Sequence, residues 1–157
     1  MVRWLFLNPD YYDPLLRFFR TTSWQLEPLL ASWATIAMSS FPIPEFNGRL
    51  LLIGDTIKVG KEAHKMPGLK LLHQESENRC ASEFVFGHHF GVVGLLVGSS
   101  TKSFCLPLQA EIHEGVDAIR PDDTLDGKPA TLVTRMGRLL VEKAKQTGRC
   151  CYATVDA

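Results

Sequence analysis

Two short apolar segments, far apart in the chain, each lead directly into an aspartate. Residues 49–54 precede Asp55, and residues 149–155 precede Asp156. Apolar runs of this length are typical of strands that are buried on both faces of a sheet. Residues 132–148 carry apolar side chains at helical spacing and lie just before the second run, so a right-handed crossover allows the two strands to lie side by side and parallel. The sequence therefore predicts an α/β fold in which the two carboxylates converge.

The N-terminal part of the chain predicts two helices. Within residues 8–40, Asp13 and Ser23 are the expected N-caps, and each is followed by apolar residues at helical spacing. The prolines in residues 41–44 end the second helix, because a proline restricts the backbone of the residue before it. We expect residues 1–46 to form a helical N-terminal segment.

The remaining pattern predicts strands and one long loop. Residues 56–82 are polar and glycine-containing, and we expect a loop there. Residues 83–98 and 103–112 predict a second and a third strand, the latter with a possible break at Pro107. The element order in residues 47–157 is therefore strand, strand, strand, helix, strand.

Length and charge are those of one ordinary globular domain. The chain has 157 residues, of which 45% are hydrophobic, and its formal net charge is +0, so any nucleic-acid site must rest on a local arrangement of basic residues. The four cysteines form no C-x-x-C pair, which favours reduced thiols. No apolar run approaches the roughly 18 residues that cross a membrane, and we expect a cytoplasmic protein without a membrane partner.

Converging carboxylates have two interpretations. Two close negative charges repel each other unless a divalent cation lies between them, and carboxylate oxygens suit Mg²⁺ or Mn²⁺. Two such cations support phosphoryl transfer. The alternative is that Asp55 and Asp156 are only turn or helix-cap residues, which often follow apolar strands.

Basic residues gather after Asp55 in the sequence. The group consists of Lys58, Lys61, Lys65, Lys70, His64 and His73. These side chains would hold DNA phosphates beside a metal site, or they belong to a solvated loop. His88 and His89 alternate across a strand, so only one of them faces any given site. A zinc site from Cys80, His88 and Cys105 is conceivable, although the spacing matches no finger pattern.

One long stretch resembles a known family. The string NGRLLLIGDTIKVGKEAHKMPGLKLLHQESEN, followed by SEFVFGHHFGVVGLLV, is similar to the DDE-superfamily transposases of bacterial insertion sequences. The resemblance implies a ribonuclease H-like mixed sheet preceded by two helices. It also implies an Asp-Asp-Glu triad in which Asp55 is the first and Asp156 the second catalytic, metal-binding residue. No glutamate-bearing helix follows Ala157, so we expect a partial catalytic core that lacks the C-terminal part of the fold.

The resemblance also implies an activity, namely Mg²⁺- or Mn²⁺-dependent phosphodiester hydrolysis and strand transfer at transposon ends. Its partners would be transposon-end and target DNA, and the full-length enzyme would be a homo-oligomer. The residues expected to contact DNA are Lys58, Lys61, Lys65, His73 and Gln74. Two alternatives stay open. One is a non-catalytic remnant that at most binds DNA or a partner subunit, and the other is an unrelated α/β nuclease-like or binding domain.

Overall fold

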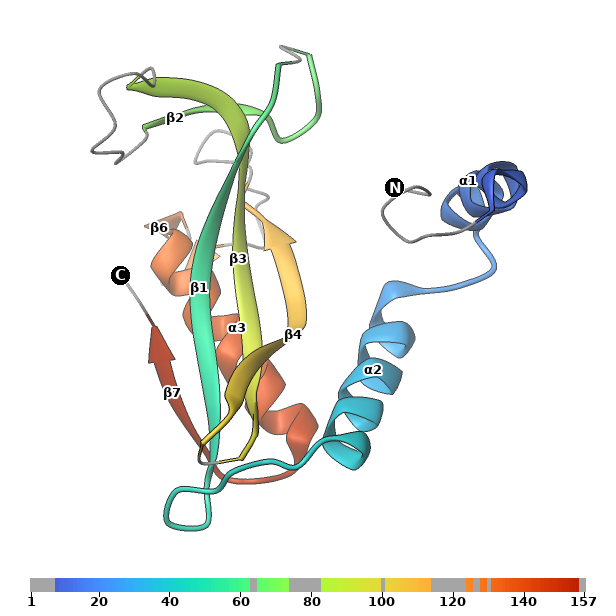
Figure 1. Cartoon of the computed structure of the whole chain (residues 1–157). Helices are drawn as coiled ribbons and strands as arrows, with labels where there is room; N and C mark the ends of the chain where they lie inside the picture. Colours follow the sequence, from blue (N-terminus) through green and yellow to red (C-terminus); the bar gives the residue numbers. More distant parts are fainter. Residues whose placement is uncertain are drawn as a thin grey trace.

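The computed structural model describes residues 8–62, 65–73, 83–99, 101–113, 124–125, 128–129 and 131–155. Within these ranges the chain forms a mixed α/β fold with one five-stranded mixed sheet (Figure 1). The helices are η1 (Pro9–Tyr11, a 3-10 helix), α1 (Tyr12–Arg20), α2 (Leu26–Ser40) and α3 (Leu132–Thr147). The sheet strands are β1 (Leu50–Gly60), β2 (Lys70–His73), β3 (Phe84–Gly98), β4 (Ser103–Ile112) and β7 (Cys151–Val155). A separate pair is formed by β5 (Thr124–Leu125) and β6 (Lys128–Pro129).

The sheet places the first and last strands next to each other. β1 lies between β3, to which it is antiparallel, and β7, to which it is parallel. β2 and β4 are both antiparallel to β3 and pair with different parts of it. The parallel pairing of the two apolar segments, which the sequence predicted, is therefore confirmed.

The prediction that the first strand ends at Asp55 is wrong. β1 continues to Gly60, because residues 55–60 pair with residues 87–92 of the long strand β3. The expected loop at residues 56–82 is therefore wrong in part, since it contains the end of β1 and all of β2. A long antiparallel partner supplies backbone hydrogen bonds to a segment whose own side chains are too polar to indicate a strand.

Both predicted N-caps are also wrong. α1 begins at Tyr12, so Asp13 lies inside its first turn rather than at its cap. α2 begins only at Leu26, and the Ser23 hydroxyl instead lies 2.7 Å from the Thr21 hydroxyl. Serine often makes such local contacts in turns, which then compete with helix capping.

Helix α3 covers one face of the sheet and forms the core with it. Its bounds agree with the predicted helix, and Gly148 ends it in the left-handed conformation at φ 64°. The helix α2 packs against the edge of this core, where the Trp33 Nε1 donates a hydrogen bond of 2.8 Å to the Pro107 carbonyl of β4. The buried core residues are Ala37, Leu50, Leu52, Val93, Leu95, Val97, Leu108, Met136, Leu139 and Leu140.

The other face of the sheet has no described helix over it. In Figure 1, α3 passes behind β1 and β3, whereas α1 and α2 lie to one side. Side chains alternate along β1, so the buried Leu50 and Leu52 face α3 and Leu51, Ile53 and Asp55 face away from it. We call the side with Asp55 the open face and the other side the α3 face.

Candidate metal-binding site

Asp55 lies on the open face, in the middle of β1 rather than at its end. Its side chain is exposed, and Val92 is its partner across the antiparallel pair with β3. The Asp55 Oδ1 accepts a hydrogen bond of 2.6 Å from the Thr56 backbone N–H. This contact holds the carboxylate close to its own backbone on a surface that is accessible to solvent.

β7 ends beside Asp55. Its pairing with β1 runs from Leu50 opposite Cys151 to Gly54 opposite Val155. These last two paired residues directly precede the two predicted catalytic aspartates in the sequence. Asp156 itself lies outside the described residues, so its predicted position beside Asp55 stays a prediction.

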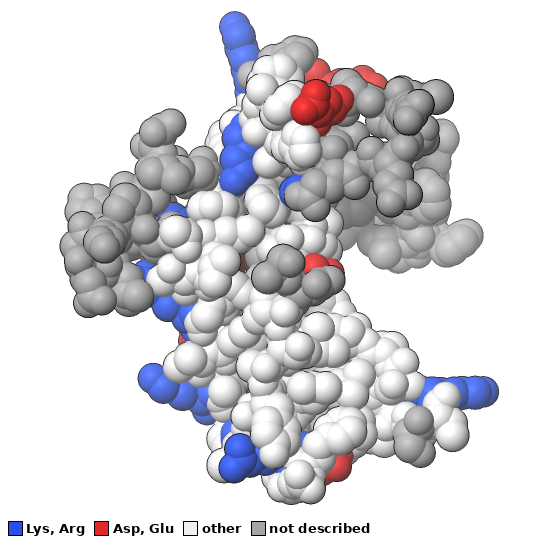
Figure 2. All heavy atoms as spheres, turned by 90° about the vertical axis from the view of Figure 1, so that its left-hand side faces the viewer, with Lys and Arg blue, Asp and Glu red and all other residues white. Residues whose placement is uncertain are grey.

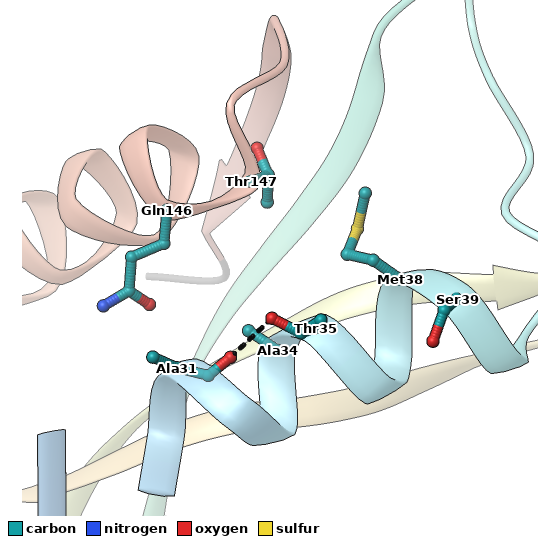
Figure 3. A pocket seen from close by; sticks show the side chains of 7 residues that line it. All are labelled: Ala31, Ala34, Thr35, Met38, Ser39, Gln146 and Thr147. Carbon is teal, nitrogen blue, oxygen red and sulfur yellow. Dashed lines mark hydrogen bonds between the residues drawn. The ribbon is translucent and has the colours of Figure 1, made fainter. Parts of the chain in front are cut away.

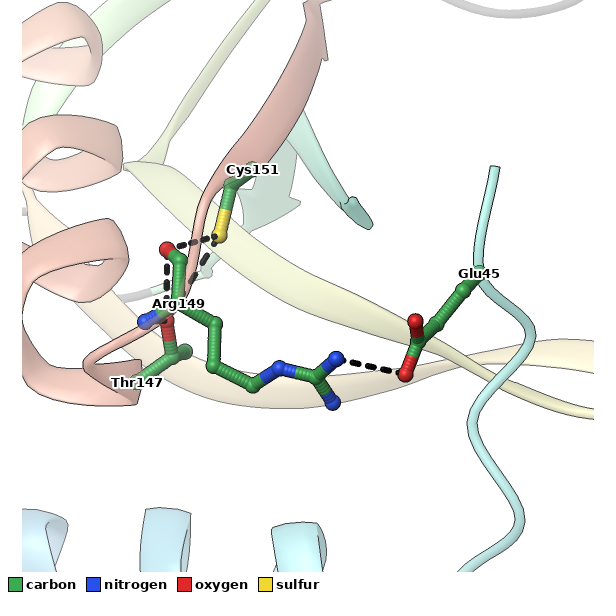
Figure 4. Close-up of polar contacts among 4 residues, drawn as sticks. All are labelled: Glu45, Thr147, Arg149 and Cys151. Atoms are coloured by element: carbon green, nitrogen blue, oxygen red, sulfur yellow. Dashed lines mark hydrogen bonds and ion pairs between the residues drawn. The ribbon is translucent and has the colours of Figure 1, made fainter. Parts of the chain in front are cut away.

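Polar contacts at the start of β7 help to set its register on β1. The Arg149 Nη2 donates a hydrogen bond of 2.6 Å to Glu45 Oε1, which joins the turn after α3 to the segment before β1 (Figure 4). The Leu50 N–H donates a hydrogen bond of 3.0 Å to the Cys150 carbonyl. A one-residue slip would turn every side chain of β7 to the opposite face, so these contacts help to fix which β7 residues share a face with Asp55.

Cys105 of β4 lies close enough to Asp55 for the carboxylate charge to affect the pKa of its thiol. Burial raises the pKa of the Cys105 thiol, and the Asp55 carboxylate raises it further. The thiol therefore stays protonated at neutral pH in the absence of a metal.

The zinc site that the sequence makes conceivable is not assembled in the described part of the chain. The His88 Nε2 lies 2.9 Å from the Pro67 carbonyl, and Cys80 lies outside the described residues. Among the residues that the structure describes, no group of three or more His, Cys, Asp or Glu side chains is placed to hold a metal ion.

Lys58 is separated from Asp55 by the sheet. It follows Asp55 by three positions in the same strand, so alternation directs its side chain to the α3 face. The Lys58 Nζ donates a hydrogen bond of 3.1 Å to the His73 carbonyl. The His73 ring packs edge-on against Phe84, and its Nε2 lies 3.5 Å from Glu83 Oε1. The structure therefore does not bring Lys58 together with Asp55, although the two are close in sequence.

Two other predicted DNA contacts follow β1. Lys61 and Lys65 are exposed, and the Lys61 backbone N–H donates a hydrogen bond of 2.7 Å to the Phe86 carbonyl. His64 and Gln74 lie outside the described residues. Figure 2, which views the molecule from the left-hand side of Figure 1, shows Lys and Arg at the top, down the left margin, at the bottom and at the lower right, around a largely uncharged surface.

The sequence missed a cluster on the α3 face. Lys70 of β2, His89 of β3 and His113 after β4 lie together there, with Arg135 of α3 nearby. The sequence signals were the adjacent pair His88 and His89 and the presence of Lys70 in the basic group after Asp55. The partners of His89 come from strands that lie far apart in the chain, so no local pattern indicates the cluster.

A groove between α2 and α3 carries no charged side chain. Its volume is about 380 Å³, and the Thr35 hydroxyl at its wall donates a hydrogen bond of 3.0 Å to the Ala31 carbonyl (Figure 3). The lining residues are Ala31, Ala34, Thr35, Met38, Ser39, Gln146 and Thr147. None of these is a site residue predicted from the sequence, and we assign the groove no chemistry.

Comparisons with known proteins give no relative. No protein-family model matches the chain, and searches of the curated proteins and of the solved structures find no match either. Within the described residues, the helices are too short or too polar to cross a membrane.

Proposed function

We propose that this chain is part of a DNA transposase of the DDE superfamily, with a ribonuclease H-like core that carries out metal-dependent phosphodiester hydrolysis and strand transfer. The observation that carries the proposal is the parallel pairing of Gly54 with Val155. These residues directly precede Asp55 and Asp156, and the proposal requires the two carboxylates to lie side by side on the open face. The strand order β4-β3-β1-β7, with only β7 parallel to β1, supports it.

The chemistry of Asp55 fits a hard divalent cation. Its exposed carboxylate offers oxygen ligands, which Mg²⁺ and Mn²⁺ prefer. When bound, Mg²⁺ or Mn²⁺ supplies Lewis-acid stabilisation to a phosphodiester undergoing in-line displacement. The role of Asp55 is then to hold the cation on a face that no described helix covers, where a DNA strand has access to it.

Binding of Mn²⁺ to the ¹⁵N-labelled chain tests the metal site directly. We expect paramagnetic broadening of the Gly54 and Val155 amide signals, and its loss in Asp55→Asn and in Asp156→Asn. Asp10→Asn, which changes an exposed acid outside the sheet, is the matched control. Equal broadening in Asp55→Asn and the wild type would exclude a metal site at this carboxylate.

A nicking assay on supercoiled DNA distinguishes a catalytic core from a non-catalytic remnant. Mg²⁺- or Mn²⁺-dependent nicking that Asp55→Asn abolishes would support a catalytic core. Metal binding without nicking would instead favour the non-catalytic alternative, in which the chain at most binds DNA or a partner subunit.

Lys61 and Lys65 are proposed to bind the DNA backbone. Replacing both by alanine should weaken DNA binding and lower the salt slope of log K by roughly 2, about one for each phosphate that the lysines no longer neutralise. Lys102→Ala, in the exposed turn between β3 and β4, is the control. An unchanged salt slope in the double variant would show that these lysines do not bind DNA phosphates.

A further inference from the structure

Lys58, His89 and His113 form a row across neighbouring strands on the α3 face. Lys58 of β1 is the register partner of His89 in β3. The His113 backbone N–H donates a hydrogen bond of 2.7 Å to the His89 carbonyl, and the centroids of the two imidazole rings are 6.1 Å apart. The row thus lies on the opposite side of the sheet from Asp55.

Each of these imidazoles has a ring nitrogen without a partner among the described residues. His89 Nε2 and His113 Nδ1 are buried and have no hydrogen-bond partner there, and only 9% of the His113 surface is exposed. Buried polar atoms in folded proteins are almost always hydrogen-bonded, because removing them from water without a partner is costly. Two such atoms on neighbouring rings need partners beyond the described residues, and one shared ligand would supply both.

The charge around the two rings is positive. Burial, followed by Lys70, Arg135 and His89 in that order, lowers the pKa of His113 to about 4. Burial also lowers the pKa of His89, together with Lys70 and then Lys58. Both rings are therefore neutral at pH 7, so each can carry its one N–H on the nitrogen that lacks a partner. This surrounding charge opposes a metal cation and favours an anion.

The N-terminal part of α3 also favours binding of an anion. A cavity of about 10 Å³ lies between the sheet and the first turns of α3, with His113, Arg135 and Glu111 in its wall. That volume is close to the minimum for one water-sized group, so one ligand oxygen fits beside His113 rather than a whole phosphate. His89 and Lys70 do not line this cavity, and His89 lies next to His113 in the row. Glu111 opposes an anion, but its Oε1 accepts a hydrogen bond of 2.5 Å from Gln109 Nε2. The helix N-terminus itself favours negative charge.

We propose that His89, His113 and Lys70 form an anion site that takes one oxygen of a phosphate group, with Lys58 and Arg135 contributing positive charge. The two imidazoles donate N–H groups to that oxygen, and the Lys70 ammonium balances its charge. Isolated phosphate and a nucleic-acid phosphodiester share this chemistry. The site does not depend on the carboxylates of the open face.

Histidine NMR on the full chain tests the site. The ring signals of His89 and His113 are followed during titration with inorganic phosphate and, separately, with a short DNA duplex, both in the presence of a metal chelator. We expect both rings to shift together and the pKa of His113 to rise from about 4 toward 6.5, because an anion stabilises the protonated ring. A response to DNA alone identifies a phosphodiester, and a response to inorganic phosphate shows that an isolated phosphate is sufficient.

Substitutions away from the buried rings keep the test independent of folding. Lys70→Gln should weaken the response about tenfold, whereas Lys102→Gln, in the exposed β3–β4 turn, should not change it. Asp55→Asn should also leave it unchanged, which separates this site from the proposed metal site. A separate titration with Zn²⁺ omits the chelator. The inference is overturned if neither anion moves the two rings, if Zn²⁺ moves them instead, or if Lys70→Gln and Lys102→Gln behave alike.

Discussion

Gly54 lies directly against the Met136 side chain, and a Cβ added at Gly54 would lie 2.9 Å from the Met136 Sδ and 3.3 Å from a Val155 methyl group. The absence of a side chain at this position lets α3 pack closely over β1 just before Asp55. We expect Gly54→Val to lower the free energy of unfolding by about 1–3 kcal/mol, because the core must shift to accept the added groups. Urea denaturation measures the loss.

A glycine in open space provides the contrast to Gly54. A Cβ at Gly137, on the outer side of α3, would have nothing within 4 Å. Gly137→Ala should therefore stabilise the protein by up to about 1 kcal/mol through helix propensity alone. If both glycine variants changed stability by the same amount and sign, close packing at Gly54 would not be the cause.

Lys143 is a buried charge for which burial lowers the pKa more than the carboxylates of Glu142 and Glu111 raise it. Its side chain is 1% exposed, and its Nζ donates one hydrogen bond of 2.8 Å to Gln146 Oε1. We expect Lys143→Met to raise the free energy of unfolding at pH 7 by about 1–4 kcal/mol, the range seen when buried ionic groups are replaced by apolar ones. Lys145→Met, on the exposed side of α3, is the control, and a less stable Lys143→Met variant would contradict the prediction.

The same lysine should make stability rise at alkaline pH. Burial lowers the pKa of Lys143 from 10.5 in the folded state, so the unfolded chain binds more protons between the folded pKa and 10.5. Stability therefore increases with pH across that interval. Unfolding by urea at a series of pH values should show this increase in the wild type and its loss in Lys143→Met.

His113 should make the protein sensitive to acid. Its pKa falls from 6.5 to about 4 on folding, so the unfolded chain binds more protons between those values. Stability from this group is complete above pH 6.5 and is lost progressively as the pH falls to about 4. We expect His113→Gln to flatten the pH dependence of urea unfolding over this interval, and His73→Gln is the comparison at an exposed histidine. A slope that survives in His113→Gln would assign the acid sensitivity to other groups.

Trp33 ties α2 to the sheet through its hydrogen bond to the Pro107 carbonyl. Trp33→Phe keeps most of the ring but removes the donor, and it should cost about 0.5–1.5 kcal/mol. Trp24 makes a hydrogen bond of the same 2.8 Å length to the Phe18 carbonyl of α1, a helix with no buried residue. Trp24→Phe should therefore change global stability less. Urea unfolding followed by circular dichroism compares the two, and an equal loss would contradict the larger contribution predicted for the Trp33 hydrogen bond.

Elements with a strong apolar pattern were predictable from the sequence. The bounds of β3, β4 and α3 follow from continuous or periodic apolar residues, and the register shift opposite Pro107 agrees with the expected break in β4. β2 was missed because it has only four residues, two of them polar. The end of β1 was missed because its extended conformation depends on pairing with β3. No local sequence pattern indicates that pairing.

The candidate sites were also predictable only where a local sequence pattern determines them. The convergence of β1 and β7 was predictable, because a helix between two apolar segments favours a parallel crossover. The separation of Lys58 from Asp55 depends on strand alternation beyond the predicted strand end. The grouping of Lys70 with His89 and His113 depends on which strands are neighbours in the sheet, which is a property of the whole fold.

The pairing of β1 with β7 also has a consequence for synthesis. The two strands are about 100 residues apart in sequence, so at roughly 5–20 residues per second the ribosome makes β7 some 5–20 s after β1. During that interval β1 can pair with β3, while its other edge still offers backbone groups to any extended chain nearby. Until translation delivers β7, pairing of this edge with another extended chain therefore competes with correct assembly.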